Sequence, residues 1–206
     1  MSLFNFDVNT KEISTAHKPE SPKVSKSYRT KSKSKNLLRK ENAKEIIERI
    51  GGLPLKDESV DLITNGQSNA GGFYEVIRDK WGTVNDLCIA TWIINREYIN
   101  MLLSDMKEGR LENLTMIISN RMAQLTHHTP NFNFMKTEFM KYPSIDFRVV
   151  NSHAKTYALT NNIDYITIDG SGNWSKNPRV ENYTITNSKT KFEFRKMWMQ
   201  EFCKAK

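Results

Sequence analysis

A histidine, a lysine and a glycine-rich turn follow one another between residues 153 and 181, in an order that suits phosphodiester chemistry. Cleavage of a phosphodiester without a metal ion needs a nucleophile, a proton for the leaving oxygen and fixed donors around the phosphoryl oxygens. His153 offers an imidazole that can act as nucleophile or general acid near neutral pH. Lys155 projects from the same face if this segment is a strand. We therefore take the two residues as a candidate catalytic pair.

The turn at residues 169–173, with the sequence Asp-Gly-Ser-Gly-Asn, is the candidate phosphate site. Its glycines permit close backbone approach, while Ser171 and Asn173 present neutral donors. Glu181 follows, and its carboxylate could hold the imidazole of His153 in one tautomer. Each feature is common in proteins when it occurs alone, so the prediction depends on their joint order. The strands predicted around the turn are the segment that contains the histidine, residues 163–168 and residues 182–185.

In this order the residues resemble the phospholipase D superfamily, whose signature is His-x-Lys, four residues, Asp, about six residues and then Gly-Ser-x-Asn. The resemblance is to its small bacterial endonucleases, which carry a single motif in each chain. In these the turn is followed by a Glu-Asn strand and a last amphipathic helix with aromatic residues, and Glu181-Asn182 and the segment 192–202 occupy those places here. The resemblance covers residues 57–202. It implies an α/β fold with a mixed β-sheet flanked by helices.

The resemblance also implies a function. The expected activity is that of a metal-independent phosphodiesterase, a nuclease acting on DNA or RNA, with no cofactor and no metal ion. His153 is implied as nucleophile or general acid, Lys155 and Asn173 as ligands of the phosphoryl oxygens, Ser171 as an assisting donor, and Glu181 as the residue that orients the imidazole.

Two departures from the family signature bear on this prediction. Thr160 stands where the family has Asp, and nine residues rather than six precede Gly170. In the family that Asp is mainly structural, so its replacement leaves the nucleophile and the phosphate donors in place. The alternative interpretation is a catalytically weak or inactive member that binds nucleic acid or serves as an assembly component.

The single motif implies a homodimer. The family's chemistry needs two His-x-Lys motifs that face each other, one histidine forming a phosphohistidine and the other protonating the leaving group. The remaining histidines are His17 and the pair His127-His128, and none has a lysine two residues later. We therefore predict a two-fold homodimer with its active site across the interface. The histidine pair could also bind a metal, but the favoured prediction is a polar loop before Pro130.

Positive charge is concentrated at the N-terminus. The 206-residue chain has a net charge of +8, and residues 1–40 contribute +7 of it. Such a segment cannot bury enough apolar surface to offset chain entropy, so residues 1–36 are predicted to be a disordered basic tail. The tail would attract nucleic-acid phosphates, and a solubilising or targeting tail is the alternative. Residues 37–56 are predicted as a lead-in helix and linker, and residues 57–206 as the phospholipase D-like domain.

Strand and helix patterns alternate through the domain, which predicts an α/β sandwich with a mixed sheet. The predicted strands are 60–64, 87–94, 114–119 and 145–151, and the predicted helices are 72–80, 97–109 and 131–141. We assign Phe73 and Trp92 to the core rather than to base stacking. Met197 and Trp198 are expected to pack against the sheet.

Neither a secretory pattern nor an apolar run of the roughly 18 residues needed to cross a membrane is present in the sequence. We therefore expect a cytoplasmic protein whose partners are nucleic acid and a second copy of itself, with no membrane.

Overall fold

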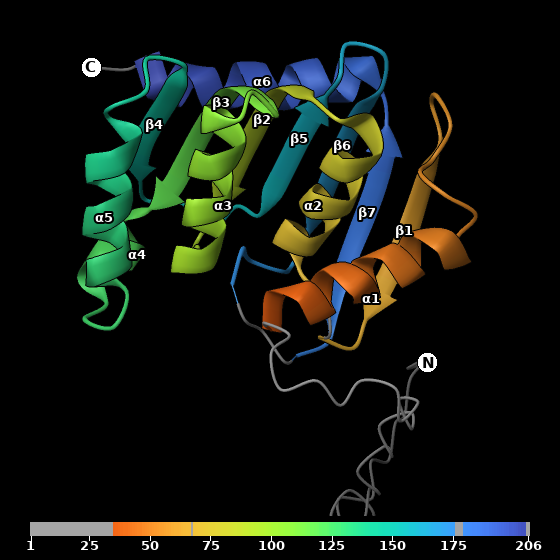
Figure 1. Cartoon of the computed structure of the whole chain (residues 1–206), viewed down its shortest axis with the longest axis horizontal. Helices are drawn as coiled ribbons and strands as arrows, with labels where there is room; N and C mark the ends of the chain where they lie inside the picture. The colour runs from red at the N-terminus through yellow and green to blue at the C-terminus, as the bar shows by residue number, and fades with distance from the viewer. Residues whose placement is uncertain (1–34, 67, 176–178, 205–206) are drawn as a thin grey trace, which may run out of the picture. The chain divides into compact units, whose positions relative to one another are not determined.

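The computed structural model describes residues 35–66, 68–175 and 179–204, with side chains from residue 39 onward. The predicted tail, residues 1–36, lies outside the described residues except for its last two. In the described part, seven strands form one sheet in the order β1-β7-β6-β5-β2-β3-β4 (Figure 1). The strands are β1 (Ser59–Thr64), β2 (Val84–Thr91), β3 (Leu111–Ser119), β4 (Ile145–Val150), β5 (Thr156–Thr160), β6 (Tyr165–Gly170) and β7 (Glu181–Asn187).

The sheet is mixed, as predicted. In the part of the sheet that runs from β1 through β7, β6 and β5 to β2, each strand is antiparallel to its neighbours. By contrast, β2, β3 and β4 run parallel to one another. The helices are α1 (Lys35–Arg49), α2 (Ala70–Trp81), α3 (Arg96–Lys107), α4 (Asn120–Gln124), α5 (Thr129–Phe139) and α6 (Lys189–Lys204). The α/β fold with a mixed sheet flanked by helices is therefore confirmed, and α4 is the element that the sequence did not predict.

Two hydrophobic clusters hold the sheet and the helices together. The larger cluster joins the sheet to α1 through α5, with Phe73 and Tyr98 among its fully buried members. The smaller cluster joins the sheet to α6, where Phe192 and Met199 pack over Ala158. Figure 1 shows α2 and α3 in front of the sheet and α6 running across the strands at the top of the view. No helix of the described residues has both the length and the apolar character to cross a membrane.

Four predicted placements are wrong. His153 and Lys155 are not on a strand, because β5 begins at Thr156 and its pairing with β2 ends at Ala90. Ile163 is not on a strand either and is 82% exposed, because β6 begins only at Tyr165.

The other two wrong placements concern side chains that were expected in the core. Trp92 is only partly buried, because β2 ends one residue before it. Met197 is 54% exposed, because the helical period turns Phe192 and Met199 of α6 toward the sheet and Met197 away from it. The partial burial of Trp198 against the smaller cluster agrees with prediction.

Candidate active site

His153 and Lys155 lie side by side in the connection between β4 and β5. The Nζ atom of Lys155 is 3.2 Å from Nδ1 of His153, and it also donates to the His153 carbonyl oxygen at 3.2 Å. The imidazole is exposed. Partial burial lowers the pKa of Lys155, and the nearby Glu181 carboxylate opposes that shift. The two residues thus form an accessible pair even though no strand aligns them.

Trp92 links the imidazole to Asn173. The rings of Trp92 and His153 are 5.3 Å apart between centroids, and the Trp92 backbone N–H donates to Oδ1 of Asn173 at 3.3 Å. The hydroxyl of Thr91 lies 3.3 Å from the same oxygen. These contacts orient the Asn173 amide through Oδ1 and do not use its Nδ2 donor. Trp92 therefore belongs to the site, and its position at the end of an apolar strand was the available signal.

Ser171 and Glu181 form a pair across the turn. The Ser171 hydroxyl donates to the Glu181 carboxylate and accepts from the backbone N–H of Asn182 at 3.1 Å. Glu181 is 5% exposed, whereas Ser171 is exposed. The carboxylate therefore lies beneath the serine and close enough to influence Lys155. Its expected role in orienting the imidazole stays a prediction.

The glycines of the turn are required by the close approach of Tyr183. A Cβ atom at Gly170 would clash with the carbonyl oxygen of Asn182, and one at Gly172 would clash with the hydroxyl of Tyr183. The buried Tyr157 hydroxyl donates to the carbonyl oxygen of Gly172 and holds the turn against β5. The turn is therefore fixed from both sides by neighbouring strands.

Thr160, which stands in place of the family's Asp, closes the hairpin between β5 and β6. Its hydroxyl donates to the carbonyl oxygen of Asp164 at 2.7 Å and accepts from the backbone N–H of Asn162 at 2.9 Å. Asn162 has a φ of 66°, a left-handed conformation that asparagine tolerates better than most residues. The longer interval before the turn is thus taken up by a hairpin loop, and Thr160 has a structural role.

Asp169 connects the end of β6 to α6. Its carboxylate forms ion pairs with Lys191 at 3.0 Å and Arg195 at 3.2 Å, and it accepts a hydrogen bond from Thr156. Burial by itself would raise the pKa of Asp169, but the hydrogen bonds from Thr156 and Lys191 outweigh it and lower the pKa below its usual value. Asp169 was predicted as part of the turn, and its ion pairs attach the start of the turn to α6.

A pocket of about 530 Å³ adjoins Asn173. None of its other residues was predicted, because they come from segments far apart in the sequence. The signal that could have found them is the polar residues at the starts of two predicted helices. The residues that line it are Ile93, Asn95, Arg96, Glu97, His128, Asn131, Asn173, Ser175 and Arg179.

Comparison with known proteins shows likeness in structure. The sequence matches no protein-family model and no curated protein. A phospholipase D family member, Nuc, from Salmonella typhimurium superposes with a TM-score of 0.50 and 15% identity, over 70% of this chain and 94% of its own. Phosphatidylserine synthase from Haemophilus influenzae superposes with a TM-score of 0.49 and 14% identity, over 69% of this chain and 38% of its own. Polyphosphate kinase from Porphyromonas gingivalis superposes with a TM-score of 0.44 and 12% identity, over 69% of this chain and 24% of its own.

Proposed function

The chain has the phospholipase D-like fold, and we propose that it is a metal-independent phosphodiesterase that cleaves DNA or RNA. The observation that carries the proposal is the exposed imidazole of His153 with the Lys155 ammonium group 3.2 Å from its Nδ1 atom. An accessible imidazole supplies a nucleophile, and an adjacent cation stabilises charge on phosphoryl oxygens. The basic N-terminal segment favours nucleic acid over lipid as the substrate.

In the proposed reaction, Nε2 or Nδ1 of His153 attacks phosphorus and the bond to the leaving oxygen breaks. His153 of the partner subunit gives that oxygen its proton. Water then attacks the phosphohistidine, the partner's His153 takes up the proton of the water, and the phosphate end of the cut strand leaves. Lys155 and Asn173 bind the phosphoryl oxygens, Ser171 assists them, and Glu181 orients the imidazole.

The proposal is tested with purified full-length protein on labelled single-stranded and duplex DNA and RNA, with and without a chelator. We expect cleavage that the chelator does not inhibit. His153→Asn should abolish cleavage and leave binding largely intact, while His17→Asn, a histidine outside the motif, should have little effect. Full activity of the His153→Asn protein would rule out the mechanism.

The homodimeric site has its own test, which uses mixed dimers. Co-expression of wild-type and His153→Asn chains with different tags allows the mixed dimer to be purified. Because the single shared site would need one imidazole from each subunit, the mixed dimer should be inactive. A mixed dimer with half of the wild-type activity, or a fully active monomer, would contradict the shared site.

Binding without cleavage is the alternative function, and its main support was the replacement of the family's Asp. The hydrogen bonds of Thr160 to Asn162 and Asp164 give this position a structural role in the hairpin. A structural role at this position is compatible with the enzymatic proposal. A protein that shifts DNA or RNA in a gel, with steep salt dependence, yet leaves both uncut from pH 5 to 8 would establish the alternative.

A further inference from the structure

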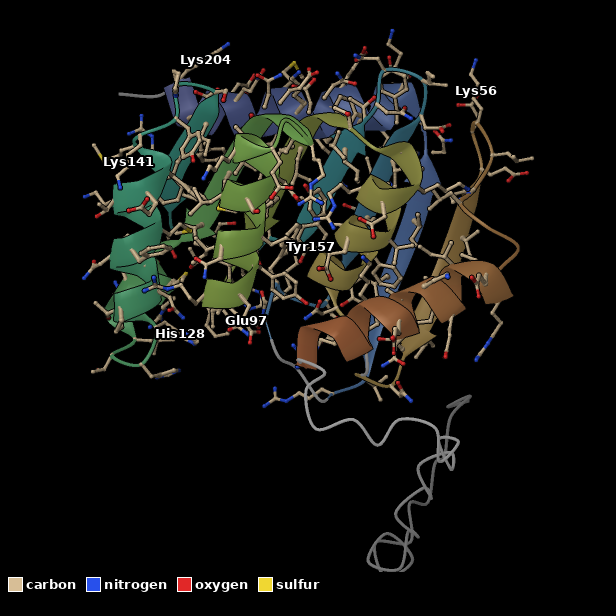
Figure 2. The ribbon with its side chains drawn as sticks, viewed as in Figure 1. Lys56, Glu97, His128, Lys141, Tyr157 and Lys204 are labelled. Carbon is tan, nitrogen blue, oxygen red and sulfur yellow. The ribbon has the colours of Figure 1, made fainter. Side chains whose placement is uncertain are left out.

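The pocket beside Asn173 is continuous with the proposed catalytic residues, because Asn173 forms part of its wall. The remaining wall comes from the starts of α3 and α5 and from residues after Asn173. Figure 2 shows two lining residues, Glu97 and His128, at the same end of these helices. Its volume of about 530 Å³ lies within the range of roughly 300–1,000 Å³ that is typical of ligand sites. The proposed phosphoryl transfer leaves this space unused.

Arg96 supplies a flat, fixed surface in the pocket. Its guanidinium carbon lies 3.5 Å from the centroid of the Phe134 ring, and its Nε donates to Oδ1 of Asn131 at 3.3 Å. Phe134 covers one face of the guanidinium, and Arg96 itself lines the pocket. Proteins that bind single-stranded nucleic acid stack unpaired bases on guanidinium planes of this kind.

The charges around the pocket favour an anion. Arg96 and Arg179 contribute two guanidinium groups, and Glu97 is the one carboxylate among the described residues that line it. Asn95 and His128 are the N-cap residues directly before α3 and α5, and because neither side chain makes a capping hydrogen bond, neither is held by its helix end. The N-terminal ends of two helices add positive potential at the same place.

Two buried polar groups in the pocket wall point to a polar ligand. Asn173 and Ser175 are each 9% exposed and both line the pocket. Their hydrogen bonds within the described residues use Oδ1 of Asn173 and the carbonyl oxygen of Ser175. The Nδ2 group of Asn173 and the hydroxyl of Ser175 are donors, so both suit a ligand that brings acceptors.

From these observations we infer that the pocket binds an unpaired nucleotide next to the scissile phosphate, with its base stacked on Arg96 and its phosphate directed to Arg179. The inference rests on the proposed function, because it names the form of substrate that the same site takes. A base paired inside a duplex is not free to stack on a protein side chain. The protein therefore prefers single-stranded nucleic acid, or strands that are locally opened, over a continuous duplex.

Binding is tested by fluorescence anisotropy of full-length protein carrying His153→Asn, so that cleavage does not interfere. Arg96→Gln should weaken binding of a short single-stranded oligonucleotide by roughly tenfold or more, and binding of the matching duplex much less. Asn95→Ala should weaken single-strand binding without lowering the unfolding temperature, because its side chain caps nothing. The control is Lys141→Gln, which removes a positive charge at the other end of α5 (Figure 2).

The outcomes separate this inference from the proposed function. Unchanged single-strand affinity in folded Arg96→Gln and Asn95→Ala proteins would overturn the pocket inference, even if His153→Asn abolishes cleavage. Equal weakening by Lys141→Gln, or equal loss of duplex binding, would also overturn it, because the weaker binding would then reflect the overall charge of the protein and not the pocket. Selective loss of single-strand binding would support the pocket inference even if the wild-type protein cleaves nothing. Absence of cleavage would then overturn the proposed function alone.

Discussion

The carboxylate of Asp169 accepts a hydrogen bond from the hydroxyl of Thr156, the residue that follows Lys155. Asp169 itself comes directly before the glycine-rich turn, and it pairs with Lys191 and Arg195 of α6. One carboxylate thus holds together the strand that follows the histidine-lysine pair, the strand that leads into the turn, and the helix on the far face of the sheet.

Asp169→Asn should lower the free energy of unfolding by about 1–3 kcal/mol near neutral pH, because charged hydrogen bonds are lost. The pKa of Asp169 is lowered in the folded protein from its usual 3.8. Its contribution is therefore complete above that value and is lost as the pH falls through the lower folded pKa. Urea unfolding at a series of pH values should show the variant and the parent converging in acid. The exposed Asp61→Asn is the control.

Glu75 should make the protein less stable as the pH rises. Burial raises its pKa from 4.5 to about 7, and its Oε2 atom has no hydrogen-bond partner among the described residues. Because the folded pKa is raised, the stability contribution is complete below 4.5 and falls as the pH rises through 7. Glu75→Gln should remove this dependence and raise the free energy of unfolding at pH 8 by roughly 1–2 kcal/mol.

Thermal unfolding of the Glu75→Gln protein at pH 5 and pH 8 measures the effect. Glu193→Gln, on the exposed face of α6, removes the same charge and should leave the pH dependence of the parent unchanged. Parallel pH profiles for parent and Glu75→Gln would contradict the prediction.

Thr160→Val should destabilise the hairpin between β5 and β6. Valine keeps the shape of threonine but lacks its hydroxyl, so the carbonyl oxygen of Asp164 and the N–H of Asn162 each lose their hydrogen bond to residue 160. We expect a loss of about 1–3 kcal/mol in chemical unfolding. Thr160→Ser retains both hydrogen bonds and should lose much less. Equal losses in the two variants would show that the methyl group, and not the hydroxyl, is responsible.

Gly172→Ala should destabilise the turn, because its Cβ would clash with the hydroxyl of Tyr183. Tyr183→Phe should by itself cost little, since that hydroxyl makes no hydrogen bond within the described residues. In the double variant the aromatic ring still presses on the new methyl group, so rescue should be partial. A double-mutant cycle in urea measures the coupling. Strictly additive losses would exclude the steric explanation.

Local patterns predicted most of the fold. The spacing of apolar residues located α2 and α3 and the parallel strands, because periodicity depends only on nearby residues. The strand that was predicted at His153 is wrong for a non-local reason. The alternating sequence pattern continues upstream of Thr156, but the partner strand β2 ends at Thr91. Where a strand loses its neighbour is decided by chain segments far away in the sequence.

The candidate site was predictable where a motif brought residues together within one segment. The residues of the histidine-lysine pair and the turn were found in this way. Trp92 was not, because its contact with His153 joins residues that are 61 positions apart in the sequence. The pocket was missed for the same reason, since Arg96 and Arg179 line it from segments far apart in the sequence.

The hairpin tip between β5 and β6 offers a place to attach a reporter. Thr160 and Tyr165 are the last paired residues of the two strands, and Ile163 projects into solvent between them. Asp164 is fixed by Asn187, and Oδ1 of Asn161 accepts from the backbone N–H groups of Ile163 and Asp164. An insertion between Asn162 and Ile163 would therefore cost the two bonds to Asn161 but leave the paired residues Thr160 and Tyr165 in place. A short epitope or fluorophore-binding peptide inserted there would lengthen the loop without moving the strands that carry the turn, so the protein could be followed in cells with the candidate site in place.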